Sequence, residues 1–239
     1  MTIMSNRHAP RIRRRPEGLA THTLLLAGLS TIALAGCAKL GEDVFSNETA
    51  PFDEPVRRWL LAHRSNTADA VFLLATRAGG PSVVIPLSIA AGLWLRERRN
   101  LPIAGAVMLA PASALTLFLL IKRIYRRQRP AGAALLGEHT FSFPSGHAAS
   151  AAAVFGSLAY VLWREDMLGG ATACALSMVP PLLIGTSRVY LDVHYATDVL
   201  GGWSVGSLVA AMSAVVYERV RTLTKNQGVP QPDGRAPVT

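Results

Sequence analysis

The sequence predicts an all-α integral membrane helical bundle with about six transmembrane helices, and three observations support this class. Half of the 239 residues are hydrophobic and only 16% are charged, whereas a soluble domain carries about 25% charged residues. Long apolar runs recur along the chain, and a spanning helix needs about 20 such residues. Gly, Ala and Ser are frequent in two of these runs, which suits close helix packing in lipid. A soluble protein with buried helices is therefore disfavoured.

Six apolar stretches are the candidate spans. The third, fifth and sixth have the length of a span, whereas the second and fourth need residues from their flanks. The chain length favours one compact bundle over two domains. In order, the stretches are Leu19–Gly36, Pro81–Leu95, Leu101–Ile121, Ala148–Trp163, Met167–Ser187 and Val199–Tyr217.

The first stretch has two interpretations. The basic segment Arg11–Arg15 precedes a short apolar run that ends in Leu34-Ala35-Gly36-Cys37. This order resembles a bacterial lipoprotein signal, in which Cys37 becomes the lipidated N-terminus and five spans remain, and the short apolar core is typical of a signal peptide. The alternative, which we slightly favour, is an uncleaved helix. Both interpretations place Cys37 on the outer side of the membrane.

The segments between the spans complete the predicted organisation. The segment "DEPVRRWLLAHR" has an amphipathic face with Asp53 as its cap, which predicts a helix lying on the outer membrane surface, or alternatively a packed bundle helix. The polar C-terminal tail is expected to be disordered. The predicted parts are a basic cytoplasmic tail over 1–18, a membrane-embedded domain over 19–220 with external interfacial helices over 53–77, and a disordered cytoplasmic tail over 221–239.

The net charge of +9 indicates either a nucleic-acid partner or a membrane and phosphate partner. No nucleic-acid motif interleaves the basic residues with aromatic ones, so we expect no nucleic-acid partner. With Arg11–Arg15 placed inside, the positive charge on the outer side is concentrated in one loop, Lys122–Arg129. A positive-inside rule that is broken at one loop indicates an anionic ligand there. The two cysteines lie in separate apolar segments and imply no disulfide framework.

Three polar clusters fall on the same outer face because of the parity of the spans. Their positions follow from the apolar runs alone, without reference to the motifs, which makes their meeting an independent observation. They are Lys122-x6-Arg129-Pro130 after the third span, Pro144-Ser145-Gly146-His147 before the fourth, and Ser187-Arg188-x5-His194-x3-Asp198 between the fifth and sixth.

These clusters resemble the three-part motif of the phosphatidic acid phosphatase type 2 / vanadium haloperoxidase superfamily, KxxxxxxRP, PSGH and SRxxxxxHxxxD. Every specified position matches, and the similarity extends roughly from Asp53 to Tyr217. Because the haloperoxidases of this superfamily are soluble, the resemblance points to its membrane lipid phosphatase branch.

The residue types fit phosphoryl transfer, which needs positive charge around the phosphate oxygens, an in-line nucleophile and an acid for the leaving oxygen. The positive charge is expected from Lys122, Arg129 and Arg188. At the start of the fourth span, Ser145 and the Gly146 amide are expected to donate hydrogen bonds to an anion.

His194 and Asp198 are four residues apart and share a helix face, so the carboxylate can fix the imidazole tautomer. The spacing alone does not distinguish the roles of the two histidines. The resemblance implies that His194 is the nucleophile, through a phosphohistidine, and that His147 is the general acid and later the base. It implies no metal and no other cofactor, because the cations are side chains.

The sequence therefore predicts a phosphatase that hydrolyses a lipid phosphate or diphosphate at the outer face of a bacterial cytoplasmic membrane, with membrane lipids as its partners. Undecaprenyl diphosphate, phosphatidic acid, phosphatidylglycerol phosphate and lipid A phosphates are candidate substrates, of which the first fits best. A lipid phosphotransferase with the same intermediate and a non-catalytic lipid-binding protein are the alternatives. The oligomeric state stays open.

Several residues near the motifs are given non-catalytic interpretations. Arg123, Arg126 and Arg127 match no motif position and are expected to bind lipid headgroups or to be solvated. Tyr190 and Trp203 are expected to be interfacial anchors. Glu138 could help to position substrate, but the favoured interpretation is an exposed loop carboxylate.

Overall fold

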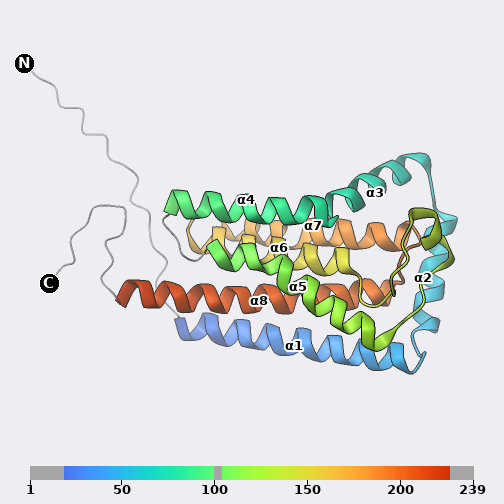
Figure 1. Ribbon diagram of the computed structural model, residues 1–239, viewed down its shortest axis with the longest axis horizontal. Coiled ribbons are helices and arrows are strands. Elements are labelled where there is room, and N and C mark those ends of the chain that lie inside the picture. The colour runs from blue at the N-terminus through green and yellow to red at the C-terminus, as the bar shows by residue number, and fades with distance from the viewer. Residues whose placement is uncertain (1–18, 100–103, 227–239) are drawn as a thin grey trace, which may run out of the picture.

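The structure, a computed structural model, describes residues 19–99 and 104–226, and this part of the chain is entirely helical. The long helices lie lengthwise side by side, whereas α2 crosses one end of the bundle (Figure 1). The all-α class is confirmed. The elements are α1 (Leu19–Phe45), α2 (Ala50–Ala62), α3 (Asn66–Ala78), α4 (Pro81–Arg99), α5 (Ala104–Tyr125), the 3-10 helix η1 (Ala131–Leu136), α6 (Gly146–Arg164), α7 (Gly170–Tyr190) and α8 (Ala196–Asn226).

Three of the described helices are long and apolar enough to cross a membrane, namely α6, α7 and the part of α8 over Ala196–Leu223. A fourth span results if α3 and α4 are taken as one helix bent by 52° at their junction. Large apolar side chains such as Leu24, Ile32 and Val179 are exposed on the bundle surface, as expected for contact with lipid. The membrane fold is thus supported, and the count of six spans stays a prediction.

The central helix is α6, which contacts α4, α5, α7 and α8. Its packing against α8 depends on two glycines, Gly202 and Gly206. A Cβ atom at Gly206 would lie 2.3 Å from the Ala149 carbonyl oxygen, and one at Gly202 would lie 2.5 Å from the Ser145 carbonyl oxygen. Only glycine permits such an approach of two backbones. The close packing of the two small-residue runs is therefore confirmed.

Replacing Gly202 by Ala is expected to lower the thermal unfolding midpoint of the protein. The new methyl group would collide with the backbone at the start of α6, and overpacking of this kind costs about 1–3 kcal/mol. Thermal unfolding of purified protein in detergent measures the effect. Gly28→Ala on α1 is the control, because a Cβ atom there meets nothing within 4 Å; equal midpoints for the two variants would contradict the packing argument.

Successive long helices run in opposite directions, so the end of α5, the start of α6, the end of α7 and the start of α8 lie at one end of the bundle (Figure 1). This is the end that α2 crosses. The three motif clusters therefore meet, as the span parity predicts. At the opposite end of α6, a buried ion pair joins Arg164 to Glu218, with Arg164 Nη2 3.0 Å from Glu218 Oε2.

Some expectations about individual segments are wrong. Thr49, rather than Asp53, precedes the first turn of α2, and Asp53 is buried. Tyr190 is not an interfacial anchor, because it is buried and its hydroxyl donates to Asp69 Oδ1 at 2.7 Å. Trp203 is half-buried and donates from Nε1 to the Pro181 carbonyl oxygen at 3.0 Å, and its role as an interfacial anchor stays a prediction.

The two predicted tails lie mostly outside the described residues. Helix α8 continues to Asn226, so the predicted disordered segment 221–239 begins as helix. The rest of that segment and residues 1–18 are not described. The surface location of 53–77 stays a prediction. These residues belong mostly to α2 and α3. On α2, Val56 and Leu60 are partly buried and pack against the apolar core.

Candidate active site

The imidazole of His194 lies in the turn between α7 and α8, where it is 2% exposed. Its Nε2 atom is 3.1 Å from Arg129 Nη1. A guanidinium group can only donate, so this contact requires an unprotonated Nε2 and places the ring proton on Nδ1. The lone pair of Nε2 therefore faces a cationic group, which is the arrangement that a nucleophile toward an anionic substrate needs.

The other ring nitrogen is held by a short relay. Nδ1 of His194 lies 3.3 Å from Ser142 Oγ and 3.5 Å from Asp198 Oδ2. The Ser142 hydroxyl in turn donates to Asp198 Oδ2. Sequence reasoning placed Asp198 correctly beside His194 but missed Ser142, because nothing in its spacing distinguishes it from other loop serines. The relay fixes the ring and its tautomer.

Arg129 and Arg188 share one carboxylate. Arg129 Nη2 lies 3.1 Å from Glu138 Oε2, and Arg188 Nη2 donates to Glu138 Oε1. Glu138 is thus a bridging residue, and its interpretation as an exposed loop carboxylate is wrong. Burial opposes its ionisation, but the charges of Arg188 and Arg129 prevail and hold the pKa of Glu138 below its usual value. A carboxylate between two guanidinium groups marks a place suited to an anion.

Further contacts hold the two guanidinium groups in place. Arg129 Nε donates to the Thr140 carbonyl oxygen at 2.6 Å, and its Nη1 donates to the Val193 carbonyl oxygen at 2.9 Å. Arg188 Nη1 donates to Thr76 Oγ1, on α3, at 2.6 Å. Each group is therefore oriented before any substrate arrives, as electrostatic stabilisation of a transition state requires.

Lys122 supplies the third cation from the last turn of α5. Its side chain is buried and donates from Nζ to the Phe141 carbonyl oxygen. It lies within electrostatic range of Arg129, Glu138 and Arg188. The three predicted cations of the site are therefore together at the same end of the bundle.

Two buried donors in the motifs have no hydrogen-bond partner, namely Ser145 Oγ and Arg188 Nε. An unsatisfied buried donor costs about 1–3 kcal/mol, and native proteins tolerate few of them. Both groups were predicted to contact phosphate oxygens. Their unused hydrogen-bonding capacity is what a phosphate group would satisfy.

The start of α6 places Gly146 and His147 beside these groups. A Cβ atom at Gly146 would lie 2.8 Å from the Phe118 ring, so close packing against α5 requires glycine there. His147 lies within electrostatic range of Arg188, Glu138 and His194. Its Nε2 is near the junction of α3 and α4, where a Cβ atom at Gly80 would lie 3.9 Å away.

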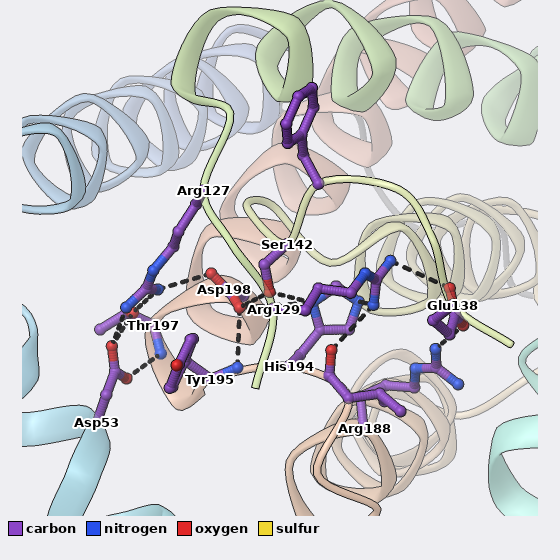
Figure 2. A network of polar contacts seen from close by, with 12 residues as sticks. Asp53, Arg127, Arg129, Glu138, Ser142, Arg188, His194, Tyr195, Thr197 and Asp198 are labelled. Atoms are coloured by element: carbon purple, nitrogen blue, oxygen red, sulfur yellow. Dashed lines mark hydrogen bonds and ion pairs between the residues drawn. The ribbon is translucent and has the colours of Figure 1, made fainter. Parts of the chain in front are cut away.

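Arg127 behaves differently from the neighbouring arginines. Arg123 and Arg126 are exposed, as expected, but Arg127 forms ion pairs of 2.6 Å with Asp53 and 2.7 Å with Asp198. The expectation that it is solvated or binds headgroups is wrong. Figure 2 shows that the polar contacts continue from Asp53 through Arg127 and Asp198 to His194, and on to Arg188.

Comparison with known proteins identifies the family. Residues 102–222 match the model of the PAP2 superfamily. The chain belongs to the PAP2 superfamily. Phosphatidylglycerophosphatase B of Bacillus subtilis is 32% identical over 185 residues, which cover 76% of this chain and 91% of that protein. The decaprenylphosphoryl-5-phosphoribose phosphatase of Mycobacterium tuberculosis is 37% identical over 124 residues, 49% of this chain and 61% of that protein.

A solved structure agrees with this PAP2 assignment. The crystal structure of a transmembrane PAP2 type phosphatidylglycerolphosphate phosphatase from Bacillus subtilis has a TM-score of 0.70 and 28% identity to this chain, and covers 82% of it and 96% of that chain. The family recognised from three motifs and the predicted enzyme class, a phosphatase, are therefore confirmed. The roles of individual PAP2 motif residues stay predictions.

A metal site would need a different set of side chains from those gathered here. Among the described residues, no group of three or more His, Cys, Asp or Glu side chains is arranged to hold a metal ion. The groups that meet at this end of the PAP2 fold are cationic donors, two imidazoles and carboxylates already paired with arginine.

Proposed function

We propose that this chain hydrolyses a phosphate or diphosphate group of a membrane lipid through a phosphohistidine intermediate on His194. One observation carries the proposal. The unprotonated Nε2 of His194 lies 3.1 Å from Arg129 Nη1, and the same guanidinium group shares the Glu138 carboxylate with Arg188. A nucleophilic nitrogen thus lies beside a pair of arginines that already hold an anionic group.

The mechanism follows from these positions. The substrate phosphate takes the place of the Glu138 carboxylate between Arg129 and Arg188, and Nε2 of His194 attacks phosphorus in line. The bond from phosphorus to the lipid oxygen breaks while His147 gives a proton to that oxygen. Asp198, through Ser142, stabilises the positive charge on the imidazole.

The second half of the reaction restores the enzyme. A water molecule gives a proton to His147 and attacks phosphorus, the bond from phosphorus to His194 Nε2 breaks, and inorganic phosphate leaves. The two histidines therefore divide nucleophilic and acid–base work, and each returns to its starting protonation state.

The proposed substrate is amphiphilic, and the proposed reaction face is external. The relatives are named for lipid phosphates with different headgroups, so a lipid phosphate as a class is better supported than one lipid. The start of α1 lies at the end of the bundle opposite the site (Figure 1). If the basic segment that precedes α1 is cytoplasmic, the site faces the periplasm or exterior.

Phosphate release from a panel of lipids tests the proposal. Purified protein in detergent is given phosphatidylglycerol phosphate, phosphatidic acid, undecaprenyl diphosphate and lipid A, and radiolabelled phosphoenzyme is trapped by acid-free denaturation because phosphohistidine is labile in acid. We expect turnover of at least one lipid, with a labelled His194 peptide. No release from any lipid would refute the proposal.

Because the cations are side chains, EDTA is expected to leave the rate of phosphate release unchanged within about twofold.

The pH profile is a second test. Burial lowers the pKa of His194 to about 4, against the opposing effect of Asp198, and only the neutral ring can attack phosphorus. The profile of kcat/KM reports groups of the free enzyme. After correction for ionisation of the substrate and of His147, which must carry a proton to act as the acid, kcat/KM should therefore decline as the pH falls through about 4 because His194 becomes protonated. A decline centred near the ordinary histidine pKa of about 6.5 would contradict a buried, neutral His194.

A further inference from the structure

The side of Asp198 that faces away from His194 is occupied by Arg127. Arg127 Nη1 donates to Asp198 Oδ1 at 2.7 Å, and Nη2 donates to Asp53 Oδ2 at 2.6 Å (Figure 2). Asp53 belongs to α2 and is 1% exposed. One guanidinium group therefore connects a carboxylate of the crossing helix with the carboxylate beside the proposed nucleophile.

Asp53 also holds the residue before Asp198. The backbone N–H of Thr197 donates to Asp53 Oδ1 at 2.9 Å, and its hydroxyl donates to Asp53 Oδ2 at 2.7 Å. The first turn of α8 is thus fixed by α2, while Arg127 fixes the rotation of the Asp198 carboxylate. With Oδ1 held by Arg127, Oδ2 is left to face Ser142 and the backbone N–H of Tyr195.

Attachment of α2 to the bundle does not by itself account for this arrangement. An arginine of α2 itself, Arg57, already makes a bidentate pair with Asp192 at 2.6 and 2.9 Å, and Val56 and Leu60 pack against buried apolar residues. Burying an arginine between two carboxylates carries a large desolvation penalty. Arg127 holds the Asp198 carboxylate, which is the acceptor of the relay from His194. This contact gives Arg127 a function that attachment of α2 alone does not explain.

We propose that Arg127 is a positioning residue for the reaction, which fixes Asp198 and, through it, the tautomer of His194, while Asp53 of α2 holds Arg127 in place. The crossing helix is then part of the catalytic apparatus although none of its side chains touches substrate. The kinetic consequence rests on the proposed function; the effect on the His194 tautomer does not.

The test uses the double variant D53N/R127Q in the full chain. It removes one positive and one negative charge together, so the buried network keeps its net charge, and Asp198 loses the guanidinium group that holds its Oδ1. The charged and titratable groups that face His194, namely Asp198, Arg129, Lys122, Glu138 and His147, are all retained. R127K is the second variant; its single ammonium group cannot bind both carboxylates as the fork of arginine does.

The primary measurement is independent of turnover. In protein labelled with ¹⁵N-histidine, the His194 signals, assigned with H194Q, report which ring nitrogen carries the proton. We expect one tautomer, protonated at Nδ1, in the wild type. In D53N/R127Q we expect a mixture of both tautomers, because an imidazole no longer held by Asp198 turns away from the Arg129 contact that requires an unprotonated Nε2. An unchanged single tautomer in the variant would overturn the inference whether or not the protein is active.

The kinetic measurement follows on the best lipid of the panel. A misoriented imidazole with the wrong tautomer costs up to about 10⁴-fold in kcat in a Ser-His-Asp enzyme, and loss of the group behind the carboxylate should cost less. We expect kcat to fall about 10–100-fold in D53N/R127Q and less in R127K, with KM changed less than about threefold. A wild type without phosphatase activity would refute the proposed function and leave the tautomer test to decide on Arg127.

The matched control is R164Q/E218Q. Its ion pair is also buried, but it lies at the other end of α6, about 28 Å away for a helix of this length. We expect it to lower the thermal midpoint while the His194 tautomer and kcat stay as in the wild type. If neither Arg127 variant yields folded protein whereas R164Q/E218Q does, Arg127 serves the fold, and the positioning role is overturned.

Discussion

Replacing His194 by Gln is expected to lower kcat by at least about 10⁴-fold, because the phosphorus–nitrogen bond of the intermediate can then no longer form. Removal of a nucleophile has effects of this size in enzymes that form covalent intermediates. The substitution keeps an amide near the position of Nε2, so the contact with Arg129 can persist while nucleophilicity is lost. Phosphate release and phosphoenzyme formation measure the two consequences separately.

The control for this substitution is His63→Gln. His63 follows α2, is exposed, and contacts its own turn through the Trp59 carbonyl oxygen at 2.7 Å and by stacking on the Trp59 ring. Its variant should retain wild-type turnover. More than about 1% of wild-type kcat in His194→Gln, with a phosphoenzyme still formed, would assign the nucleophile to another residue.

His147→Gln separates the roles of the two histidines. A general acid matters least when the leaving oxygen needs no proton. With an aryl phosphate that has a weakly basic leaving group, His147→Gln should still form phosphoenzyme, and that phosphoenzyme should persist because its hydrolysis needs His147 as base. Failure to form any phosphoenzyme would instead make His147 the nucleophile.

The location of the motif residues could be predicted because it depends only on how many times the chain crosses the bundle. Apolar runs are visible in the sequence, and their parity placed Lys122, Ser145 and His194 at one end, as the structure does. The proximity of His194 and Asp198 was also predicted, but the shared helix face was wrong, because His194 lies in the turn before α8. Span parity and a short sequence separation therefore sufficed for the framework of the site.

The remaining contacts depend on residues that are far apart in the chain. Asp53 binds Thr197 at a separation of 144 positions, and Arg188 binds Glu138 at a separation of 50. Hydropathy and helix periodicity carry no information on which distant charge a given arginine meets. For that reason Arg127 could not be distinguished from the exposed Arg123 and Arg126, since all three lie in one short basic segment.

Arg188 is the second residue from which we expect a large effect. The residue is 3% exposed. Its guanidinium group is anchored by Thr76 through Nη1, and its Nε has no hydrogen-bond partner among the described residues. Removing one preorganised donor to a developing oxyanion costs about 10²–10³-fold in kcat. Because Arg188 offers more than one donor, Arg188→Gln should lower kcat/KM by about 10³-fold or more.

Arg188→Lys distinguishes charge from geometry at this position. A lysine retains the positive charge but cannot bind Thr76 and a phosphate oxygen at once with the planar fork of arginine. We therefore expect a loss of about 10–100-fold in kcat/KM, between wild type and Arg188→Gln. The inhibition constant of orthovanadate, a phosphate mimic, should be higher in Arg188→Lys than in the wild type, and highest in Arg188→Gln. Arg77→Gln, an exposed arginine on the neighbouring α3, is the control and should change neither quantity.

The same series tests whether the phosphate replaces the Glu138 carboxylate. If Glu138 holds Arg188 only until substrate arrives, Arg188→Gln should weaken vanadate binding and Glu138→Gln should not, since the competing carboxylate charge is gone in the latter. Thermal midpoints measured alongside show whether either variant is merely less folded. Vanadate inhibition that is unchanged in Arg188→Gln would place the phosphate away from this arginine, and the anion site would then have to be assigned to Lys122 and Arg129 alone.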